Sequence, residues 1–238
     1  MNKKEENAKY IISGAMVALT LISAVTAGLL TDFSFGFIGL WATLPGAVLI
    51  YLLMVSVDNI QTECFGFGFA RRNTWICFLS EAFMILAFEM VLRLKHPVFA
   101  DTAAFQTVMH SSIRAAIASP LGFAVSSFLN SYIINGLKVK MTRKYHSTNS
   151  HIWFRTWSST VVSQAFDAFI FITITFAFTM PWNSLFMMFL GQYTFKLVVS
   201  FLWCLIETPV IKYVKEATGC DAVENDKAKL KLFAFNEN

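Results

Sequence analysis

Charged residues are scarce in this sequence. Lys, Arg, Asp and Glu make up 14% of the 238 residues, whereas hydrophobic residues make up 56%. Apolar runs recur from Tyr10 almost to the end of the chain, which is the composition of a membrane protein and not of a soluble core. The connections between the runs are short, so the sequence leaves no room for a separate soluble or nucleotide-binding domain.

Several motifs of ATP-driven and catalytic proteins are also missing. No P-loop signature (GxxxxGK followed by Ser or Thr) occurs, so the chain cannot hydrolyse ATP by a P-loop itself. Neither GxSxG nor HExxH occurs, which argues against an intramembrane enzyme. The four cysteines show no CxxC or Cys/His spacing, which indicates neither a disulfide framework nor a zinc site. We therefore expect no catalytic residues, no metal and no cofactor.

The sequence does contain windows long enough to cross a bilayer core, which takes about 20 apolar residues. We predict an all-α integral membrane protein with a bundle of about six transmembrane helices in one domain, residues 1–215, followed by a polar tail at 216–238. The windows are 10–30, 37–57, 75–92, 112–137, 153–180 and 184–214. The first window is longer than the apolar region of a signal peptide and lacks a convincing cleavage site, so we expect an uncleaved helix.

Basic residues predict the orientation of these spans. With a cytoplasmic N-terminus, six spans leave only Arg93 and Lys95 outside among the basic residues near the membrane, and the connections 31–36 and 181–183 carry no Lys or Arg. We expect a multi-pass protein of the cell (inner or plasma) membrane with both termini in the cytoplasm. The net charge of +4 then needs no nucleic-acid partner.

A polar stripe interrupts the apolar window at 153–180. Thr160, Gln164 and Asp167 stand at i, i+4 and i+7 and share one helix face. An ionised carboxylate inside a bilayer must face a neighbouring helix, a wet cavity or a ligand, so Asp167 is a functional candidate, with a brace between helices as the alternative. Lys196 in the next window has two sensible partners, which are Asp167 and an anionic or carbonyl-bearing ligand.

Other polar positions lie near the ends of windows. Asn59 and Glu63 share a face if the second helix runs through them before Gly66 breaks or bends it, and a solvated helix end is the alternative. Arg114 lies near the end of its window, where a long side chain can also snorkel to the interface. Ser159 belongs to a group of small polar residues that can serve helix packing alone.

Four segments carry a resemblance to a known family. They read NxxxExFGFGxARR at 59–72, RAAIAS at 114–119, RTWSSTVVSQAFDAFIF at 155–171 and YTFKLVVSFLWCLIETP at 193–209. In this order they resemble the queuosine precursor transporter family, also called the vitamin uptake transporter family. Its best-defined motif is matched by Arg155, Ser159, Thr160, Gln164, Asp167 and Phe171.

The resemblance implies import of 7-cyano-7-deazaguanine or 7-aminomethyl-7-deazaguanine for tRNA modification. A carboxylate, Glu63 or Asp167, would accept from the donor edge of the base, and a cationic or amide side chain would donate to O6. The substrate-binding residues predicted on this basis are Asn59, Glu63, Arg114, Arg155, Ser159, Gln164, Asp167 and Lys196.

The chain departs from the family pattern in two places. The family usually has an aspartate where Asn59 stands, and Asp58 is displaced by one position; the family often has Gln and Asp where this chain has Ser127 and Asn130. A related purine-like base is therefore an alternative substrate. The chain could also be a substrate-capture subunit with an energising ATPase partner, and energy coupling and assembly into a homo-oligomer are left open.

Overall fold

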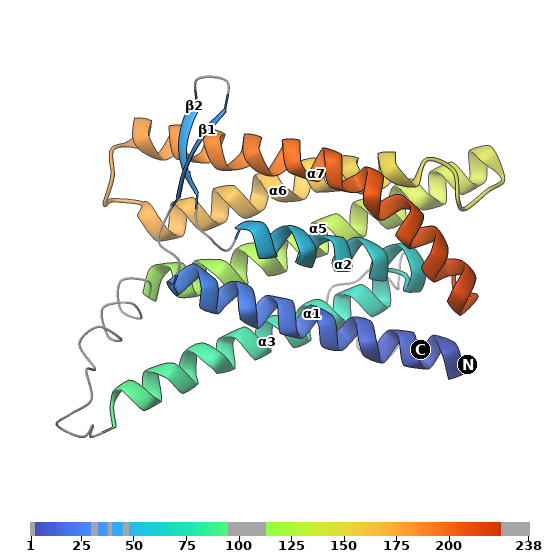
Figure 1. Ribbon diagram of the computed structural model, residues 1–238, viewed down its shortest axis with the longest axis horizontal. Coiled ribbons are helices and arrows are strands. Elements are labelled where there is room, and N and C mark those ends of the chain that lie inside the picture. The colour runs from blue at the N-terminus through green and yellow to red at the C-terminus, as the bar shows by residue number, and fades with distance from the viewer. Residues whose placement is uncertain (1–2, 30–32, 38–39, 45–47, 95–112, 225–238) are drawn as a thin grey trace.

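The structure, a computed structural model, describes residues 3–29, 33–37, 40–44, 48–94 and 113–224. These residues form helices that run along one common axis (Figure 1). The helices are α1 (Lys3–Leu29), α2 (Val48–Phe65), α3 (Phe67–Leu92), α5 (Ile113–Tyr145), α6 (Ile152–Phe176) and α7 (Trp182–Thr218). Between α1 and α2 in the sequence, β1 (Phe33–Phe37) and β2 (Leu40–Leu44) pair as an antiparallel hairpin with Phe33 opposite Leu44.

The helical membrane fold is confirmed. Within the described ranges, five helical segments are long and apolar enough to cross a membrane: Lys3–Thr26, Phe67–Val91, Ile117–Tyr145, Ile152–Phe176 and Trp182–Thr218. The helix expected at 37–57 differs, because Phe37 and Leu40–Leu44 belong to the two strands and α2 runs from Val48 to Phe65. The sequence carries Pro45 and Gly46 inside that window, a pair that interrupts helices. The prediction relied on the hydrophobicity of the window and overlooked this pair.

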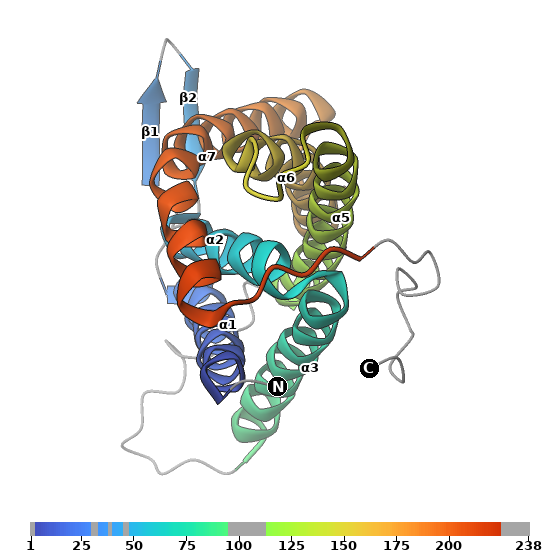
Figure 2. The same ribbon diagram turned by 90° about the vertical axis from the view of Figure 1, so that its right-hand side faces the viewer.

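Helix α2 occupies the centre of the bundle. It contacts α1, α3, α5 and α7, and the view along the bundle places it between the α1–α3 side and the layer formed by α5, α6 and α7 (Figure 2). This position explains why α2 can carry a row of polar residues. Asp58, Asn59, Gln61, Thr62 and Glu63 are all buried there.

The bundle is polar inside and apolar outside. The buried side chains include more polar and charged residues than hydrophobic ones, whereas large apolar residues such as Phe83, Leu86 and Phe169 are exposed. A soluble protein shows the opposite distribution, but lipid solvates apolar side chains and leaves polar ones to face each other. The arrangement therefore supports a membrane-embedded bundle with a polar interior.

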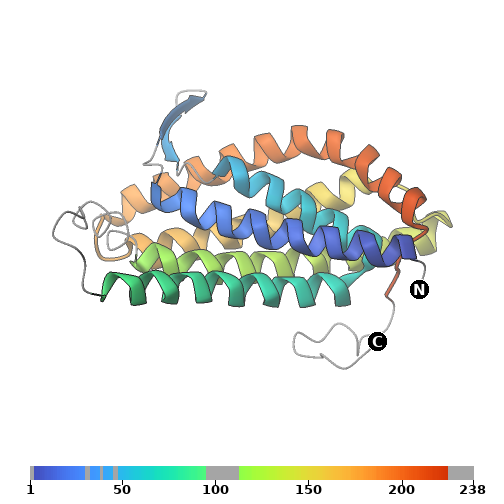
Figure 3. The same ribbon diagram turned by 60° about the horizontal axis from the view of Figure 1, so that its bottom comes forward.

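Glycine and proline shape two of the helices. Gly66 has φ +86 and separates α2 from α3, which confirms the predicted break at this position. A side chain at Gly66 would also meet Glu224 Oε1 at 2.8 Å. In contrast, Pro209 does not end its helix: α7 continues to Thr218 and arches over the bundle (Figure 3).

Candidate functional site

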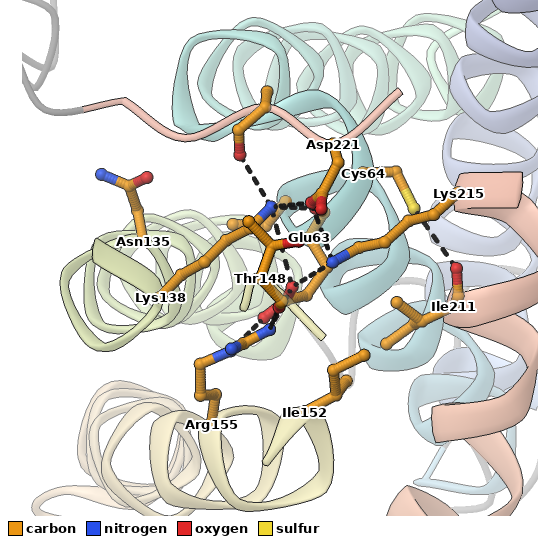
Figure 4. Close-up of polar contacts among 12 residues, drawn as sticks. Glu63, Cys64, Asn135, Lys138, Thr148, Ile152, Arg155, Ile211, Lys215 and Asp221 are labelled. Atoms are coloured by element: carbon orange, nitrogen blue, oxygen red, sulfur yellow. Dashed lines mark hydrogen bonds and ion pairs between the residues drawn. The ribbon is translucent and has the colours of Figure 1, made fainter. Parts of the chain in front are cut away.

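An ion cluster fills one end of the bundle. Glu63 and Arg155 are fully buried, and Arg155 forms a double hydrogen bond with the carboxylate, Nε to Oε1 at 2.8 Å and Nη2 to Oε2 at 2.9 Å (Figure 4). Lys215 Nζ lies 3.2 Å from Glu63 Oε2, and Lys138 Nζ lies 3.9 Å from it. Asp221 then joins the two lysines, with its Oδ1 at 2.6 Å from Lys138 and 2.9 Å from Lys215. The cluster ties α2, α5, α6 and α7 together.

Asp221 belongs to a short strap, residues 219–224, that follows α7 and crosses this end of the bundle (Figure 2). Ala222 donates its N–H to Cys64 O at 3.1 Å, and its carbonyl accepts from Lys138 at 2.7 Å. Glu224 accepts from Gly68 N at 3.2 Å with both carboxylate oxygens. The strap thus covers the break between α2 and α3 and closes this end.

The lysines lower the pKa of Asp221, the carboxyl group of the strap that contacts them. Burial alone would raise the pKa of Asp221, but hydrogen bonds from Lys138, Thr148 and Lys215 together hold this pKa below its ordinary value. Asp221 is therefore ionised at neutral pH and offsets part of the positive charge of Lys138, Lys215 and Arg155.

A second polar centre lies further along α2, at Asp58. Its Oδ1 accepts from Ser127 at 2.8 Å and from Gln61 at 2.7 Å, and its Oδ2 accepts from Asn130 at 2.9 Å. These three hydrogen bonds replace part of the hydration that the carboxyl group loses on burial. Asp58 thus joins α2 to α5 through Ser127 and Asn130.

This centre continues as a chain of hydrogen bonds to α7. Asn130 Nδ2 also donates to Asn59 Oδ1 at 2.7 Å, and Asn59 Nδ2 donates to Glu207 Oε2 at 3.3 Å. The order Asp58, Asn130, Asn59, Glu207 therefore connects α5, α2 and α7 through buried groups. We call these four residues the relay.

Of the two partners considered for Lys196, the structure shows Asp167. Lys196 Nζ lies 2.6 Å from Asp167 Oδ2, and both side chains are buried. The same ammonium lies 4.1 Å from the centroid of the Tyr51 ring, close enough for a cation–π contact. Gly122 lets α5 approach this pair, since a Cβ there would lie 3.0 Å from Asp167 Oδ1.

Two small cavities flank Val55 of α2, each with a volume of about 10 Å³, enough for one water molecule. The first, here the tyrosine cavity, has a lining that includes Tyr51, Asp58, Phe123, Asn130, Ser163 and Gln164. The second, here the glutamate cavity, has a lining that includes Ser56, Asn59, Thr160, Ser200, Trp203 and Glu207. Val55 lines both cavities and separates them.

Three buried acceptor atoms in these linings lack hydrogen-bond partners within the described residues. They are Asn130 Oδ1 and Gln164 Oε1 in the tyrosine cavity and Glu207 Oε1 in the glutamate cavity. A buried acceptor without a donor costs about 1–3 kcal/mol, so such atoms are uncommon in folded proteins unless a ligand or water serves them. The two acceptors in the tyrosine cavity, Asn130 Oδ1 and Gln164 Oε1, would be satisfied by N–H groups of a ligand.

The eight predicted site residues fall into separate places. Glu63 with Arg155 and Asp167 with Lys196 form the two ion pairs, while Gln164 and Asn59 line the two cavities. Ser159 is buried and donates to Thr156 O at 2.8 Å within its own helix. Arg114 lies apart from the others: it is exposed and donates to Ala177 O at 2.9 Å, at the end of α6.

The structure also brings in residues that the sequence interpretation did not select. Asp58 and Asn130 stood out only as departures from the family pattern, and Glu207 only as a member of the helix face of Lys196. Lys138, Lys215 and Asp221 gave no local signal, because they contact Glu63 or each other from segments far apart in the sequence. Among the described ranges, no group of three His, Cys, Asp or Glu side chains is placed to hold a metal ion.

An apolar exterior, buried ion pairs and orphaned acceptors around internal cavities are the features of a multi-pass membrane transporter. The family comparison agrees, since the chain belongs to the family described as "Putative vitamin uptake transporter", whose model matches residues 45–214. The chain is also 30% identical over 166 residues, 69% of each chain, to a protein of Bacillus subtilis (strain 168) named "Probable queuosine precursor transporter". No solved structure matches the chain.

Proposed function

We propose that this protein imports queuosine precursors, 7-cyano-7-deazaguanine, 7-aminomethyl-7-deazaguanine or both, into the cytoplasm for tRNA modification. The observation that carries the proposal is the pair of orphaned acceptors, Asn130 Oδ1 and Gln164 Oε1, beside the carboxyl group of Asp58 in the tyrosine cavity. A 7-deazaguanine base offers N–H donors at N1, at the exocyclic amine and at N9. The N–H donors of the base therefore match the acceptor atoms of the cavity.

Aromatic side chains support the same placement. Tyr51 and Phe123 are both part of the tyrosine cavity lining, and a planar bicyclic base can stack on such rings. The proposed base plane therefore lies between α2 and α5.

The Asp167–Lys196 pair adds a donor and an acceptor to this site. Lys196 contacts Tyr51, whose ring lines the cavity, so the pair lies directly beside it. Once separated by the substrate, Lys196 would donate to the O6 carbonyl and Asp167 would accept from an N–H group. The ion pair in the empty site keeps both charges satisfied, which a lone buried charge would not be.

Entry of a base requires the helices to move. Each cavity holds about 10 Å³, whereas cavities that hold drug-sized ligands measure roughly 300–1,000 Å³. The described conformation is therefore a closed one, with the ion cluster and the strap sealing one end. Separation of α2 from α5 and α6 would join the space around Tyr51 and Gln164 into a site large enough for a base.

The distribution of basic residues supports the direction of import. Arg71, Arg72, Lys138, Arg143 and Lys144 belong to the end of the bundle where α2 meets α3 and where α5 ends (Figure 1). The positive-inside rule favours a cytoplasmic location for this end. Substrate would then enter from the opposite end and leave past the ion cluster.

The test is uptake in cells that can neither make nor import the precursors. Labelled 7-cyano-7-deazaguanine and 7-aminomethyl-7-deazaguanine are supplied with and without this chain, and queuosine in tRNA is measured alongside uptake. We expect rescue by this chain alone. Failure in spite of membrane expression, followed by binding of a precursor to purified protein, would instead indicate an energising ATPase partner. Absence of binding as well would mean a different purine-like base.

A further inference from the structure

Glu207 is the buried carboxyl group that the proposed substrate site leaves unused. It lies on α7 and is 4% exposed, its Oε1 has no partner among the described residues, and its Oε2 accepts one hydrogen bond, from Asn59 at 3.3 Å. No Lys, Arg or His side chain in the described part of the chain lies within 4 Å of its oxygens, unlike Glu63 and Asp167, which are both paired. An unpaired anion at this depth is costly, so the neutral acid is the favoured form in this conformation.

Charged groups around Glu207 act in the same direction. From α2, the negative charges of Asp58 and Glu63 repel a second anion at this position. The buried cations of α6 and α7 are engaged elsewhere: Arg155 and Lys215 pair with Glu63, and Lys196 pairs with Asp167.

Three further residues on the helices around Glu207 either carry no charge or are paired with another residue. Thr160 of α6 and Cys204 of α7 line the glutamate cavity and carry no charge there. On α1, Lys9 pairs with Glu5. A proton is therefore the simplest means of neutralising Glu207.

The geometry favours a proton over a metal cation. Asn59 presents its N–H group, not its carbonyl, to Glu207, and its Oδ1 is already occupied by the Asn130 amide. A sodium ion would need several oxygen ligands, and the nearest neighbour here is a donor that repels a cation. The carbonyl oxygen of a carboxylic acid can still accept from Asn59, more weakly than a carboxylate does, so this hydrogen bond is compatible with a protonated Glu207.

The relay connects this group to the proposed substrate site. Glu207 is joined through Asn59 to Asn130, and Asn130 also binds Asp58 and offers its orphaned Oδ1 to the tyrosine cavity. A base that donates to Asn130 would alter the amide that holds Asn59, and hence the one donor to Glu207. Substrate binding and the protonation state of Glu207 can therefore influence each other by reciprocal linkage.

We infer that Glu207 is the proton-carrying residue that couples substrate import to a proton gradient, an inference that rests on the proposed import of a deazaguanine base. The carboxylate takes up a proton when the glutamate cavity opens to one side of the membrane. It releases that proton when the cavity opens to the other side. Asp58 accepts three hydrogen bonds and Glu207 accepts one, so Glu207 is the relay acid that is more readily neutral and the one to which we assign the proton.

The decisive experiment uses purified protein in proteoliposomes with the membrane potential held at zero. Exchange of labelled for unlabelled 7-cyano-7-deazaguanine without a gradient reports transport, and accumulation under a pH gradient reports coupling. We expect the unmodified protein to do both, with up to about tenfold accumulation for each pH unit if one proton accompanies one substrate. Glu207→Gln should keep exchange but equilibrate without accumulation, because a neutral amide replaces a neutral acid without releasing a proton.

A matched variant controls for the loss of any buried carboxyl group. Glu81 on α3 is also buried without an ion-pair partner in the described residues, but it accepts from Ser119 at 2.7 Å and lines neither cavity. We expect Glu81→Gln to accumulate substrate as the unmodified protein does. Three outcomes would each overturn the inference. They are loss of accumulation in Glu81→Gln but not in Glu207→Gln, accumulation of substrate by Glu207→Gln, and accumulation by the unmodified protein under a sodium gradient in place of a pH gradient.

The outcomes separate the two proposals. Exchange without any response to pH would overturn the coupling role of Glu207 and leave the transport function intact, whereas absence of exchange would overturn both. A second measurement avoids any folding defect of the variants. Dicyclohexylcarbodiimide modifies protonated carboxyl groups in apolar surroundings, so we expect peptide mass spectrometry to find it on Glu207, less at high pH and less with substrate. Modification of Glu81 but not Glu207 would contradict the proposal.

Discussion

Asn130 donates to Asp58 Oδ2 at 2.9 Å, which joins the two places where the sequence is expected to depart from the family pattern. In the sequence the two departures stand apart, as an aspartate displaced by one residue on one helix and an asparagine on another. In the structure they are direct partners, so the change on α2 and the change on α5 form one rearranged polar contact. A substrate that binds at this hydrogen bond would contact both of the altered positions, one on α2 and one on α5.

The Asp167–Lys196 pair gives the first prediction. Asp167→Asn leaves the buried Lys196 without its partner, and removal of one member of a buried ion pair typically costs about 3–5 kcal/mol. We expect lower thermal stability and no uptake. The double variant Asp167→Asn with Lys196→Met removes both charges and should recover stability while uptake stays absent. Recovery of uptake together with stability would mean that the pair is only a brace.

The second prediction concerns the orphaned acceptor of Gln164. Gln164→Leu removes an acceptor that has no donor in the empty protein, so the thermal stability should stay the same or rise. Affinity for 7-cyano-7-deazaguanine, measured by titration calorimetry, should fall about tenfold to a hundredfold, for a loss of about 1–3 kcal/mol.

The chain offers a matched control for Gln164. Gln192 on α7 is also buried and its Oε1 likewise lacks a partner within the described residues, but it lines neither cavity. Gln192→Leu should leave the affinity unchanged. Equal losses of affinity in the two variants would mean that the loss does not arise from the tyrosine cavity.

The third prediction compares two glycines. Gly66→Ala combines a strained φ of +86 with a Cβ only 2.8 Å from Glu224 Oε1, so it should displace the strap and destabilise the fold by about 1–2 kcal/mol. Gly136 lies inside α5, where an added Cβ would meet nothing within 4 Å, and Gly136→Ala should be neutral or stabilising by up to about 1 kcal/mol. Thermal unfolding in detergent measures both, and a milder effect at Gly66 than at Gly136 would contradict the strap contact.

The fourth prediction concerns pH and the strap. The pKa of Asp221 is lower in the folded protein than in the unfolded chain, where it is about 3.9, so its stabilising contribution is present above that value and disappears as the pH falls through the folded pKa. The difference in melting temperature between the unmodified protein and Asp221→Asn should therefore be constant from about pH 7 to 5 and shrink below about pH 4. A difference in melting temperature that persists at the lowest pH would mean that the ionised carboxylate of Asp221 is not the source of the stabilisation.

The sequence predicted those parts of the fold and the site that depend on local pattern. Apolar windows indicated the helices, Gly66 indicated the break, and the positions of Asp167 and Lys196 on adjacent helices allowed their pairing to be foreseen. The strands at 33–37 and 40–44 were missed because the apolar residues of the second strand resemble the start of a helix. The partners of Glu63 were missed because Lys138, Lys215 and Asp221 reach it only through tertiary contacts, and each looked like a solvated residue on the cytoplasmic surface.

The strap has a consequence for the order in which the protein is made. The ribosome synthesises Asp221 only after all the described helices, although this residue bridges Lys138 of α5 and Lys215 of α7. A chain cut short after α7 would therefore contain every described helix and still lack the carboxylate that lies between these two lysines.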